Sequence, residues 1–350
     1  MYTKITEGEA NFYVPKEKKI SKQLPVFYNK IMKLNRDISI LLINAISMSN
    51  LKLALPLEGC GIRGIRFFLE LKKGKFSSIA MNDMSSEAVK IMEKNCKENY
   101  TDIDIYNLDA NDFLLQSKGF DYIDIDPFGS PNPFLDSAIK RLSRCGILAV
   151  TATDTSCLCG TFKNVCLRKY WATPIRTEIM HEVGIRILIR KVQLIASQYS
   201  RALTPIFSYS KDHYMRVFFK SKKSKKLTDE ILKQHKMCFF GQYESFGPLW
   251  TGKLFCENLC EEMKRLNTVE KNSKFIETIS EESKINSIFF YDLHSFVKRY
   301  KIKINPRKEE VIKKIKQLNY SASNTHFLDT AIKSDIPYDE FIAILKSFEL

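Results

Sequence analysis

The stretch from Leu51 to Phe219 alternates short apolar runs with amphipathic segments, and this alternation constrains the fold more than any other feature. The apolar runs predict strands at 51–57, 77–83, the start of 102–112, 120–126 and 146–153. Strands that alternate with helices in this way build parallel sheets. Two further apolar runs, separated by two residues, predict an antiparallel pair at the sheet edge, at 205–210 and 213–219. The pattern therefore predicts an α/β fold with a largely parallel sheet.

A length of 350 residues exceeds what one hydrophobic core usually supports, so we expect two domains. The charge run from Lys220 to Lys226 (KSKKSKK) is typical of a linker or a solvated loop. Beyond it the sequence turns to Lys/Glu-rich helical patterns. We therefore predict one domain over 1–225, comprising an N-terminal segment and the α/β part, and a smaller α+β accessory domain over 226–350.

The chain carries 55 Lys and Arg against 40 Asp and Glu, a formal charge of +15, which favours a polyanionic partner such as nucleic acid. It has no long uncharged apolar run to cross a membrane, and its first residues lack the apolar core of a signal peptide. We expect an intracellular protein, in nucleus or cytoplasm, that is neither secreted nor bound to membranes. No obligate protein partner is evident.

Nine cysteines are scattered without a Cys-x-x-Cys pair, which indicates reduced thiols. Cys256 and Cys260 can share a helix face, but a zinc site needs a second pair, so we predict no metal.

A glycine-rich turn follows the first strand of this α/β stretch, and acidic residues follow the next strands. The segment from Glu58 to Gly64 (EGCGIRG) contains G-x-G-x-x-G, where bare backbone and a helix amino end can meet a cofactor. Asp83 ends the second strand, where a carboxylate can bind the ribose hydroxyls of NAD or S-adenosylmethionine. Asp109, or the backbone of Ala110, can meet the adenine edge. Carboxyl ends of parallel strands are where open α/β sheets bind ligands.

Asp126 ends the fourth strand and is followed by Pro127, Phe128 and Gly129. Nicotinamide chemistry gives no reason for this acid, whereas methylation of an exocyclic base amine does, because the amine's lone pair is delocalised into the ring. Asp126 can accept one N–H of such an amine and remove its proton, and a backbone carbonyl such as that of Pro127 can accept the other. Phe128 can stack on a flipped-out base. We therefore assign Asp126 and Phe128 as catalytic candidates.

Five segments together resemble the tRNA guanine-N2 dimethyltransferase family, in the family's order: FYNKIMKLNRDIS, DIDPFGSPNPFLDSA, TATDTSCLCG, HEVGIRILIRKV and GPLWTGKL. The resemblance implies a class I Rossmann-like methyltransferase fold, S-adenosylmethionine as methyl donor, and tRNA as partner. It implies methylation of the N2 amine of guanine-26, to N2-methyl- and N2,N2-dimethylguanosine. The basic C-terminal domain would then hold tRNA phosphates.

The resemblance also implies site residues. Arg36, Arg63 and Arg66 are similar to cofactor contacts of the family, which join Glu58, Gly59, Asp83, Asp109 and Ala110, and Asp126 is similar to its catalytic acid. His181 and Glu182 lack a third ligand at readable spacing, so we favour a structural or RNA-facing role for them. Two alternatives stay open: a non-catalytic tRNA-binding or chaperone module on this fold, and an NAD-dependent oxidoreductase.

Overall fold

The computed structural model describes residues 2–16 and 26–349. These residues form two compact units that interleave along the chain. The first unit comprises 1–153, 192–204 and 216–229, and the second comprises 154–191, 205–215 and 230–350. Each unit is described by itself below.

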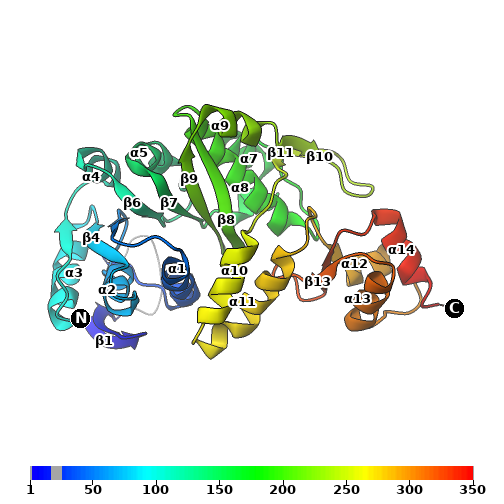
Figure 1. The fold of residues 1–350 in the computed structure, drawn as a ribbon, viewed down its shortest axis with the longest axis horizontal. Coiled ribbons are helices and arrows are strands. Elements are labelled where there is room, and N and C mark those ends of the chain that lie inside the picture. The colour runs from blue at the N-terminus through cyan, green and yellow to red at the C-terminus, as the bar shows by residue number, and fades with distance from the viewer. Residues whose placement is uncertain (1, 17–25, 350) are drawn as a thin grey trace. The chain divides into compact units, whose positions relative to one another are not determined.

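A seven-stranded sheet in the described part of the chain has the order β5-β4-β3-β6-β7-β9-β8. Figure 1 shows β6, β7, β9 and β8 side by side. The pairs β4–β5, β3–β4, β3–β6 and β6–β7 are parallel. Strand β8 is linked to β9 by two residues, so the two form a hairpin at the sheet edge. The predicted α/β architecture, with its largely parallel sheet and edge hairpin, is confirmed.

The apolar pattern predicts the order of the strands from Leu51 onward, but none of the elements before it. The strands and helices of the first unit follow one another along the chain. They are β1 (Tyr2–Glu7), β2 (Ala10–Pro15), α1 (Lys33–Ala45), β3 (Leu51–Leu55), α2 (Ile62–Glu70), β4 (Phe76–Asn82), α3 (Ser86–Glu98), β5 (Asp104–Tyr106), α4 (Ala110–Gln116), β6 (Phe120–Ile125), α5 (Leu135–Arg141) and β7 (Leu142–Ala152), with short 3-10 turns at Lys30–Met32 and Asn132–Phe134. Ser85 caps the start of α3, because its hydroxyl accepts the N–H of Ala88 at 3.3 Å.

Four elements contain residues of both units: α8 (Met180–Ser197), β8 (Arg201–Lys211), β9 (Tyr214–Lys223) and α9 (Lys225–Leu232). The second unit adds short helices and small sheets. They are α6 (Thr155–Leu158), α7 (Lys163–Tyr170), β10 (His235–Cys238), β11 (Phe246–Trp250), α10 (Glu257–Leu266), α11 (Glu270–Ser283), β12 (Tyr291–Asp292), α12 (Leu293–Arg299), α13 (Lys308–Gln317), β13 (Ala322–Asn324), β14 (Ala331–Ser334) and α14 (Tyr338–Lys346).

The charge run from Lys220 to Lys226 differs from its prediction. It is not a linker, because Lys220–Lys223 complete β9 and α9 begins at Lys225. Helix α5 ends at Arg141, and the next residue begins β7. The division into 1–225 and 226–350 stays a prediction about domains, while the compact units of the structure alternate along the chain.

All nine cysteines are free, and they fall into two groups. Cys145 and Cys256 are exposed, whereas the other seven are buried: Cys60, Cys96, Cys157, Cys159, Cys166, Cys238 and Cys260. Burial raises the pKa of the buried thiols, to about 12 for Cys60 and Cys260. Buried thiols therefore stay protonated at neutral pH.

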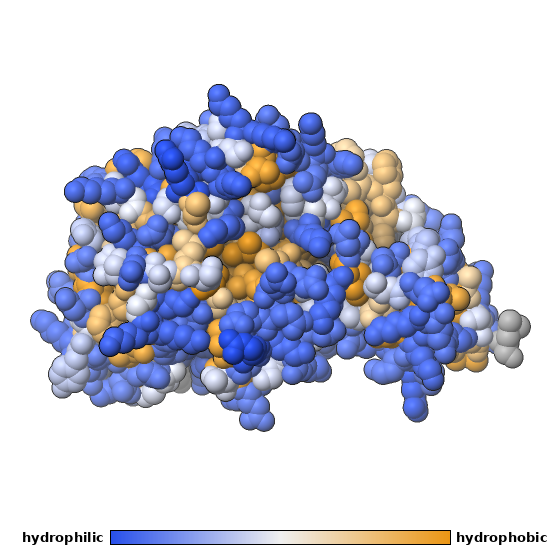
Figure 2. Space-filling model, in the orientation of Figure 1, coloured by the Kyte–Doolittle hydropathy of each residue, from blue (hydrophilic) through white to orange (hydrophobic). Residues whose placement is uncertain are grey.

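The visible surface is mostly hydrophilic, with apolar patches scattered between charged side chains (Figure 2). Among the described residues, no helix combines the length and the apolar character that crossing a bilayer requires.

Candidate active site

Four parallel neighbouring strands of the first unit, β5, β4, β3 and β6, end at one edge of the sheet. Each is followed by a residue that the sequence singled out. Glu58 comes after β3, Asp83 after β4, Asp109 after β5 and Asp126 after β6. The structure therefore brings the predicted acidic residues to one sheet edge, which we call the carboxyl edge.

The glycine-rich turn after β3 requires glycine at two positions. Gly59 and Gly61 have φ angles of +63° and +84°, in the left-handed region that other residues rarely adopt. A Cβ atom on Gly59 would also lie 2.8 Å from the carbonyl oxygen of Phe27. Gly61 precedes the first residue of α2, so the turn presents bare backbone beside a helix amino end.

Asp83 ties this turn to the end of β4. Its Oδ2 accepts the N–H of Gly59 at 2.9 Å, and its Oδ1 accepts the N–H of Ser85 at 2.9 Å. The side chain is only partly buried. A carboxylate that is fixed by two backbone donors, and still accessible, fits the vicinal hydroxyls of a ribose.

Glu58 lies under the turn and is almost fully buried. Its Oε1 accepts the N–H of Gly64 at 3.0 Å. Burial raises the pKa of Glu58 to about 8, although the nearby Arg63 opposes the shift. A carboxyl in this state changes its charge readily when a cationic ligand arrives.

Asp109 caps helix α4. Its Oδ1 accepts the N–H groups of Asn111 at 2.8 Å and Asp112 at 3.4 Å. Ala110, the first residue of that helix, is buried. Their predicted contact with an adenine edge stays a prediction.

Asp126 is held by a buried guanidinium. Arg63 of α2 donates from Nη2 to the Asp126 carboxylate and from Nη1 to Asn35 at 2.9 Å and Ser39 at 3.2 Å. The Asp126 side chain is 16% exposed, against 7% for Arg63. One side of the carboxylate is thus fixed, while part of it remains accessible.

Asp124, two residues earlier, lies behind Asp126 in the same network. It pairs with Arg216 of β9 at 2.6 and 2.7 Å, accepts the Tyr122 hydroxyl at 2.8 Å, and lies 3.4 Å from Arg63. Burial opposes ionisation, but Arg216 and Arg63 hold the pKa of Asp124 below its usual value. Our sequence reasoning missed Arg216, although a lone arginine inside the apolar run 213–219 was a signal for a buried ion pair.

The turn after Asp126 is tied to the end of β7. The N–H of Gly129 donates to the Thr153 hydroxyl at 2.6 Å, and the N–H of Thr153 donates to the carbonyl of Gly129 at 2.9 Å. Pro127 is buried, whereas Phe128 is 43% exposed. The rings of Phe128 and Phe27 meet edge to face, with centroids 4.2 Å apart. Phe128 is therefore braced on one side and open on another.

Arg36 and Arg66 occupy a different environment from Arg63. Arg36 donates to both oxygens of Glu7, at 2.6 and 2.5 Å, and Arg66 binds Glu7 at 2.9 Å and Asp37 at 2.8 Å. Both arginines are nearly fully buried. In this structure they anchor β1 to α1 and α2, and their role as cofactor contacts stays a prediction.

His181 and Glu182 belong to the second unit. Glu182 is fully buried and pairs with Arg186 at 2.8 Å and Lys333 at 3.0 Å, which agrees with a structural role. The His181 ring lies 3.5 Å from the Cys159 sulfur and 3.4 Å from the Ser210 hydroxyl. Within residues 2–16 and 26–349, no three His, Cys, Asp or Glu side chains gather as a metal site would require.

The chain is similar over nearly its whole length to known tRNA methyltransferases. The family profile described as N2,N2-dimethylguanosine tRNA methyltransferase matches residues 8–240 and 232–346. The tRNA (guanine(26)-N(2))-dimethyltransferase of Pyrococcus abyssi is 37% identical, with 98% of each chain covered. The tRNA (guanine(26)-N(2)/guanine(27)-N(2))-dimethyltransferase of Aquifex aeolicus is 35% identical over 99% of this chain and 95% of its own. The solved structure of Trm1 from Pyrococcus horikoshii with S-adenosyl-L-methionine matches with a TM-score of 0.90 and 34% identity, covering 98% of this chain and 99% of that one.

Proposed function

Because the chain belongs to the N2,N2-dimethylguanosine tRNA methyltransferase family, we propose that it methylates the exocyclic N2 of guanine-26 in tRNA. The protein is an S-adenosylmethionine-dependent methyltransferase with a Rossmann-like fold, as the family resemblance implied. The observation that carries the site assignment is the partly accessible Asp126 carboxylate, fixed by Arg63 beside the open ring of Phe128. The products would be N2-methyl- and N2,N2-dimethylguanosine.

The carboxyl edge has the features that the cofactor needs. S-adenosylmethionine, when bound, supplies an electrophilic methyl group on a sulfonium. Asp83 offers a fixed carboxylate for the ribose, Gly59 offers bare backbone, and Asp109 with Ala110 lies after the neighbouring strand. Glu58 can take negative charge, which would favour a cationic ligand. Arg36, Arg63 and Arg66 complete the proposed cofactor set, on the strength of the family resemblance.

Asp126 would orient the guanine amine and accept its proton. The N2 amine is a poor nucleophile because its lone pair is shared with the ring, so it must be turned toward the methyl group. A carboxylate that accepts one N–H, with the Pro127 carbonyl accepting the other, provides this orientation. Proton acceptance by such a group contributes roughly 100- to 10,000-fold in rate. Arg63 holds Asp126 in place, so the carboxylate need not be ordered during the reaction.

Phe128 would stack on the guanine. A base must leave its helix to reach such a site, and stacking on an aromatic ring recovers about 1–3 kcal/mol of that cost. Phe27 supports the ring from the side, which leaves a face available.

The remaining expectations follow from tRNA as substrate. We infer that residues 226–350 contact tRNA phosphates, and that the protein works inside the cell, in the nucleus or the cytoplasm, where tRNA is found. The family assignment gives no support to an NAD-dependent oxidoreductase. A non-catalytic binding module would not need a fixed, accessible carboxylate at the carboxyl edge.

One experiment tests the proposed function. Purified protein is incubated with unmodified tRNA and labelled S-adenosylmethionine, and the nucleosides are then analysed by mass spectrometry. We expect methylated guanosine at position 26, and no product from a tRNA in which adenine replaces that guanine. Tight tRNA binding without label transfer would instead identify a binding module.

A further inference from the structure

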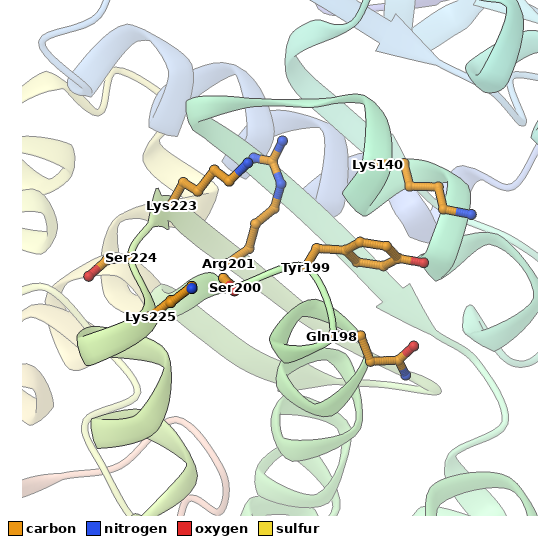
Figure 3. Close-up of a pocket in the computed structure, with 8 residues that line it drawn as sticks. All are labelled: Lys140, Gln198, Tyr199, Ser200, Arg201, Lys223, Ser224 and Lys225. Carbon is orange, nitrogen blue, oxygen red and sulfur yellow. The ribbon is translucent and has the colours of Figure 1, made fainter.

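An open cavity of about 660 Å³ lies in the first unit, away from the carboxyl edge (Figure 3). Its lining comes from the end of α5, the turn after α8, the start of β8, the end of β9 and the start of α9. The charged side chains that line it are all cationic: Lys140, Arg201, Lys223 and Lys225. We call this cavity the basal pocket.

Most of this positive charge is not compensated. Within the described residues, no carboxylate forms an ion pair with Arg201, Lys223 or Lys225, whereas Lys140 pairs with Asp136 at 2.7 Å. Arg201 is half-buried. Its Nη1 donates hydrogen bonds to the Ser143 carbonyl at 3.0 Å and to the Ser221 hydroxyl at 3.3 Å. Burial, together with the nearby Arg144, lowers the pKa of Arg201. Three cations that lack an acidic partner, beside one that is paired, favour an anionic ligand.

Polar and aromatic groups complete the lining. Tyr199 and Lys140 lie side by side in Figure 3, with the ammonium 5.6 Å from the ring centroid. Tyr199 also donates its hydroxyl to Asp136, which fixes the ring. Ser200 and Ser224 also line the cavity, and the Ser224 hydroxyl accepts the N–H of Leu227 at 3.3 Å. Several cationic N–H donors and hydroxyls around an open cavity suit the oxygens of a phosphate.

The basal pocket and Asp126 lie at opposite ends of the strands. Arg201 contacts Ser143 near the start of β7, whereas the turn after Asp126 is tied to Thr153, just past its end. Leu142 pairs with Phe120 and Val150 with Ile125, so this length of β7 matches five residue steps of β6, or about 17 Å at roughly 3.3 Å for each step. One small ligand cannot reach both places, but a folded RNA can.

We propose that the basal pocket binds a backbone phosphate of the tRNA substrate, at a point remote from the methylated guanine. This inference rests on the proposed function. It also gives a role to the lysine run 220–226, whose strand end and helix start place Lys223 and Lys225 on either side of Ser224. The protein would then hold its RNA at two separate points, one at the carboxyl ends of the parallel strands and one at their amino ends.

The test compares two double variants that each remove two positive charges. Lys223→Ala with Lys225→Ala removes two exposed pocket cations, and Lys72→Ala with Lys73→Ala removes two exposed cations outside the pocket. Lys223 ends β9 and Lys225 begins α9, whereas Lys72 and Lys73 lie in the turn between α2 and β4. Thermal unfolding verifies that each variant is folded. Fluorescence anisotropy gives the Kd for unmodified tRNA over a series of NaCl concentrations.

We expect the pocket variant to lower the slope of log Kd against log salt by about 1 for each phosphate that the protein no longer neutralises. Its KM for tRNA should rise, while kcat at saturating tRNA stays within about twofold of the wild type, because Kd depends on the pocket and the chemical step does not. The control pair should leave both slope and KM unchanged. An equal change in the two double variants, or none in the pocket variant, would overturn the proposal.

A second experiment distinguishes a phosphate of the tRNA backbone from free inorganic phosphate. Calorimetric titration with inorganic phosphate shows whether the pocket takes a free anion. Loss of phosphate binding in the pocket variant, with tRNA affinity unchanged, would assign the pocket to a free anion and overturn the RNA contact. Absence of methyl transfer by the wild type would instead count against the proposed function, whatever the slopes show.

Discussion

At the scale of single residues, Asp124 and Asp126 lie two positions apart and both contact Arg63, but they differ in burial. Residues two apart on a strand point to the same side, which is why Arg63 reaches both carboxylates. Asp124 is buried with Arg216, whereas Asp126 remains partly accessible. The two positions should therefore respond differently to the same substitution.

Asp126→Ala should stop methyl transfer while tRNA binding stays nearly intact. The loss of orientation and proton acceptance predicts a fall in kcat of roughly 100-fold or more. Single-turnover methylation and anisotropy measure the two effects. Near-normal turnover in this variant would refute the assigned role.

Asp124→Ala serves as the matched comparison. It leaves the fully buried Arg216 without its carboxylate, so we expect a loss of about 3–5 kcal/mol in the free energy of unfolding. Urea titration followed by circular dichroism measures this loss. A stability like that of the wild type would show that Arg216 finds another partner.

Glu58 should make cofactor affinity depend on pH. Its raised pKa, about 8, means that the folded protein keeps Glu58 protonated between roughly pH 4.5 and 8, where the unfolded chain would ionise it. The stability that protonated Glu58 contributes is therefore lost as the pH rises through that range. A cationic ligand favours the ionised form. We therefore expect affinity for S-adenosylmethionine to increase from pH 6 to 8, by at most about tenfold per pH unit.

Glu58→Gln is the control, because the amide keeps an oxygen for the Gly64 N–H but cannot ionise. Equilibrium dialysis over the same pH range should give a flatter profile for this variant. Parallel profiles for the two proteins would show that Glu58 does not titrate with the ligand.

At the scale of elements, Glu7 connects the N-terminal hairpin to two helices. Burial opposes its ionisation, but Arg36 and Arg66 hold the pKa of Glu7 below its usual value. Glu7→Ala leaves two buried guanidinium groups short of a partner, and should cost about 3–5 kcal/mol of unfolding free energy. The wild-type contribution is present above about pH 4.3 and is lost as pH falls below it.

Urea unfolding at pH 7 and at acidic pH measures this effect. Glu9→Ala is the control, since Glu9 is an exposed carboxylate in the same hairpin. If both variants unfold at the same urea concentration, the buried cluster does not anchor the hairpin.

The sequence predicted the strands of the parallel sheet because apolar runs of this length leave few alternatives. It failed at Lys220–Lys223, where pairing with neighbouring strands keeps a lysine-rich segment extended. The carboxyl edge was predictable because chain order alone places strand ends together. The pairing of Arg216 with Asp124 was not predictable, because the two residues lie 92 positions apart and only the folded chain brings them together.

At the scale of the whole molecule, each unit contains its own buried ion cluster. In the second unit, Arg186 and Lys333 hold the pKa of Glu182 below its usual value, although burial opposes this. Both tryptophans, Trp171 and Trp250, also belong to this unit. Tryptophan fluorescence therefore reports the unfolding of the second unit.

Glu182→Ala should lower the fluorescence-detected urea midpoint, with a loss of about 3–5 kcal/mol, because two buried cations lose their common carboxylate. The exposed Glu277→Ala, in the same unit, should leave the midpoint unchanged. Coincident midpoints for the two variants would contradict a stabilising role for this cluster. The sequence did not indicate the interleaved units, because a division along the chain assumes that each domain is continuous.

The two exposed cysteines offer labelling sites for measuring the distance between the two units. Cys145 belongs to the first unit and Cys256 to the second, and the other seven thiols are shielded by burial. A thiol-reactive donor and acceptor dye should therefore attach one to each unit without any engineered substitution. Energy transfer between the two dyes would then report whether the distance between the units changes when tRNA is added.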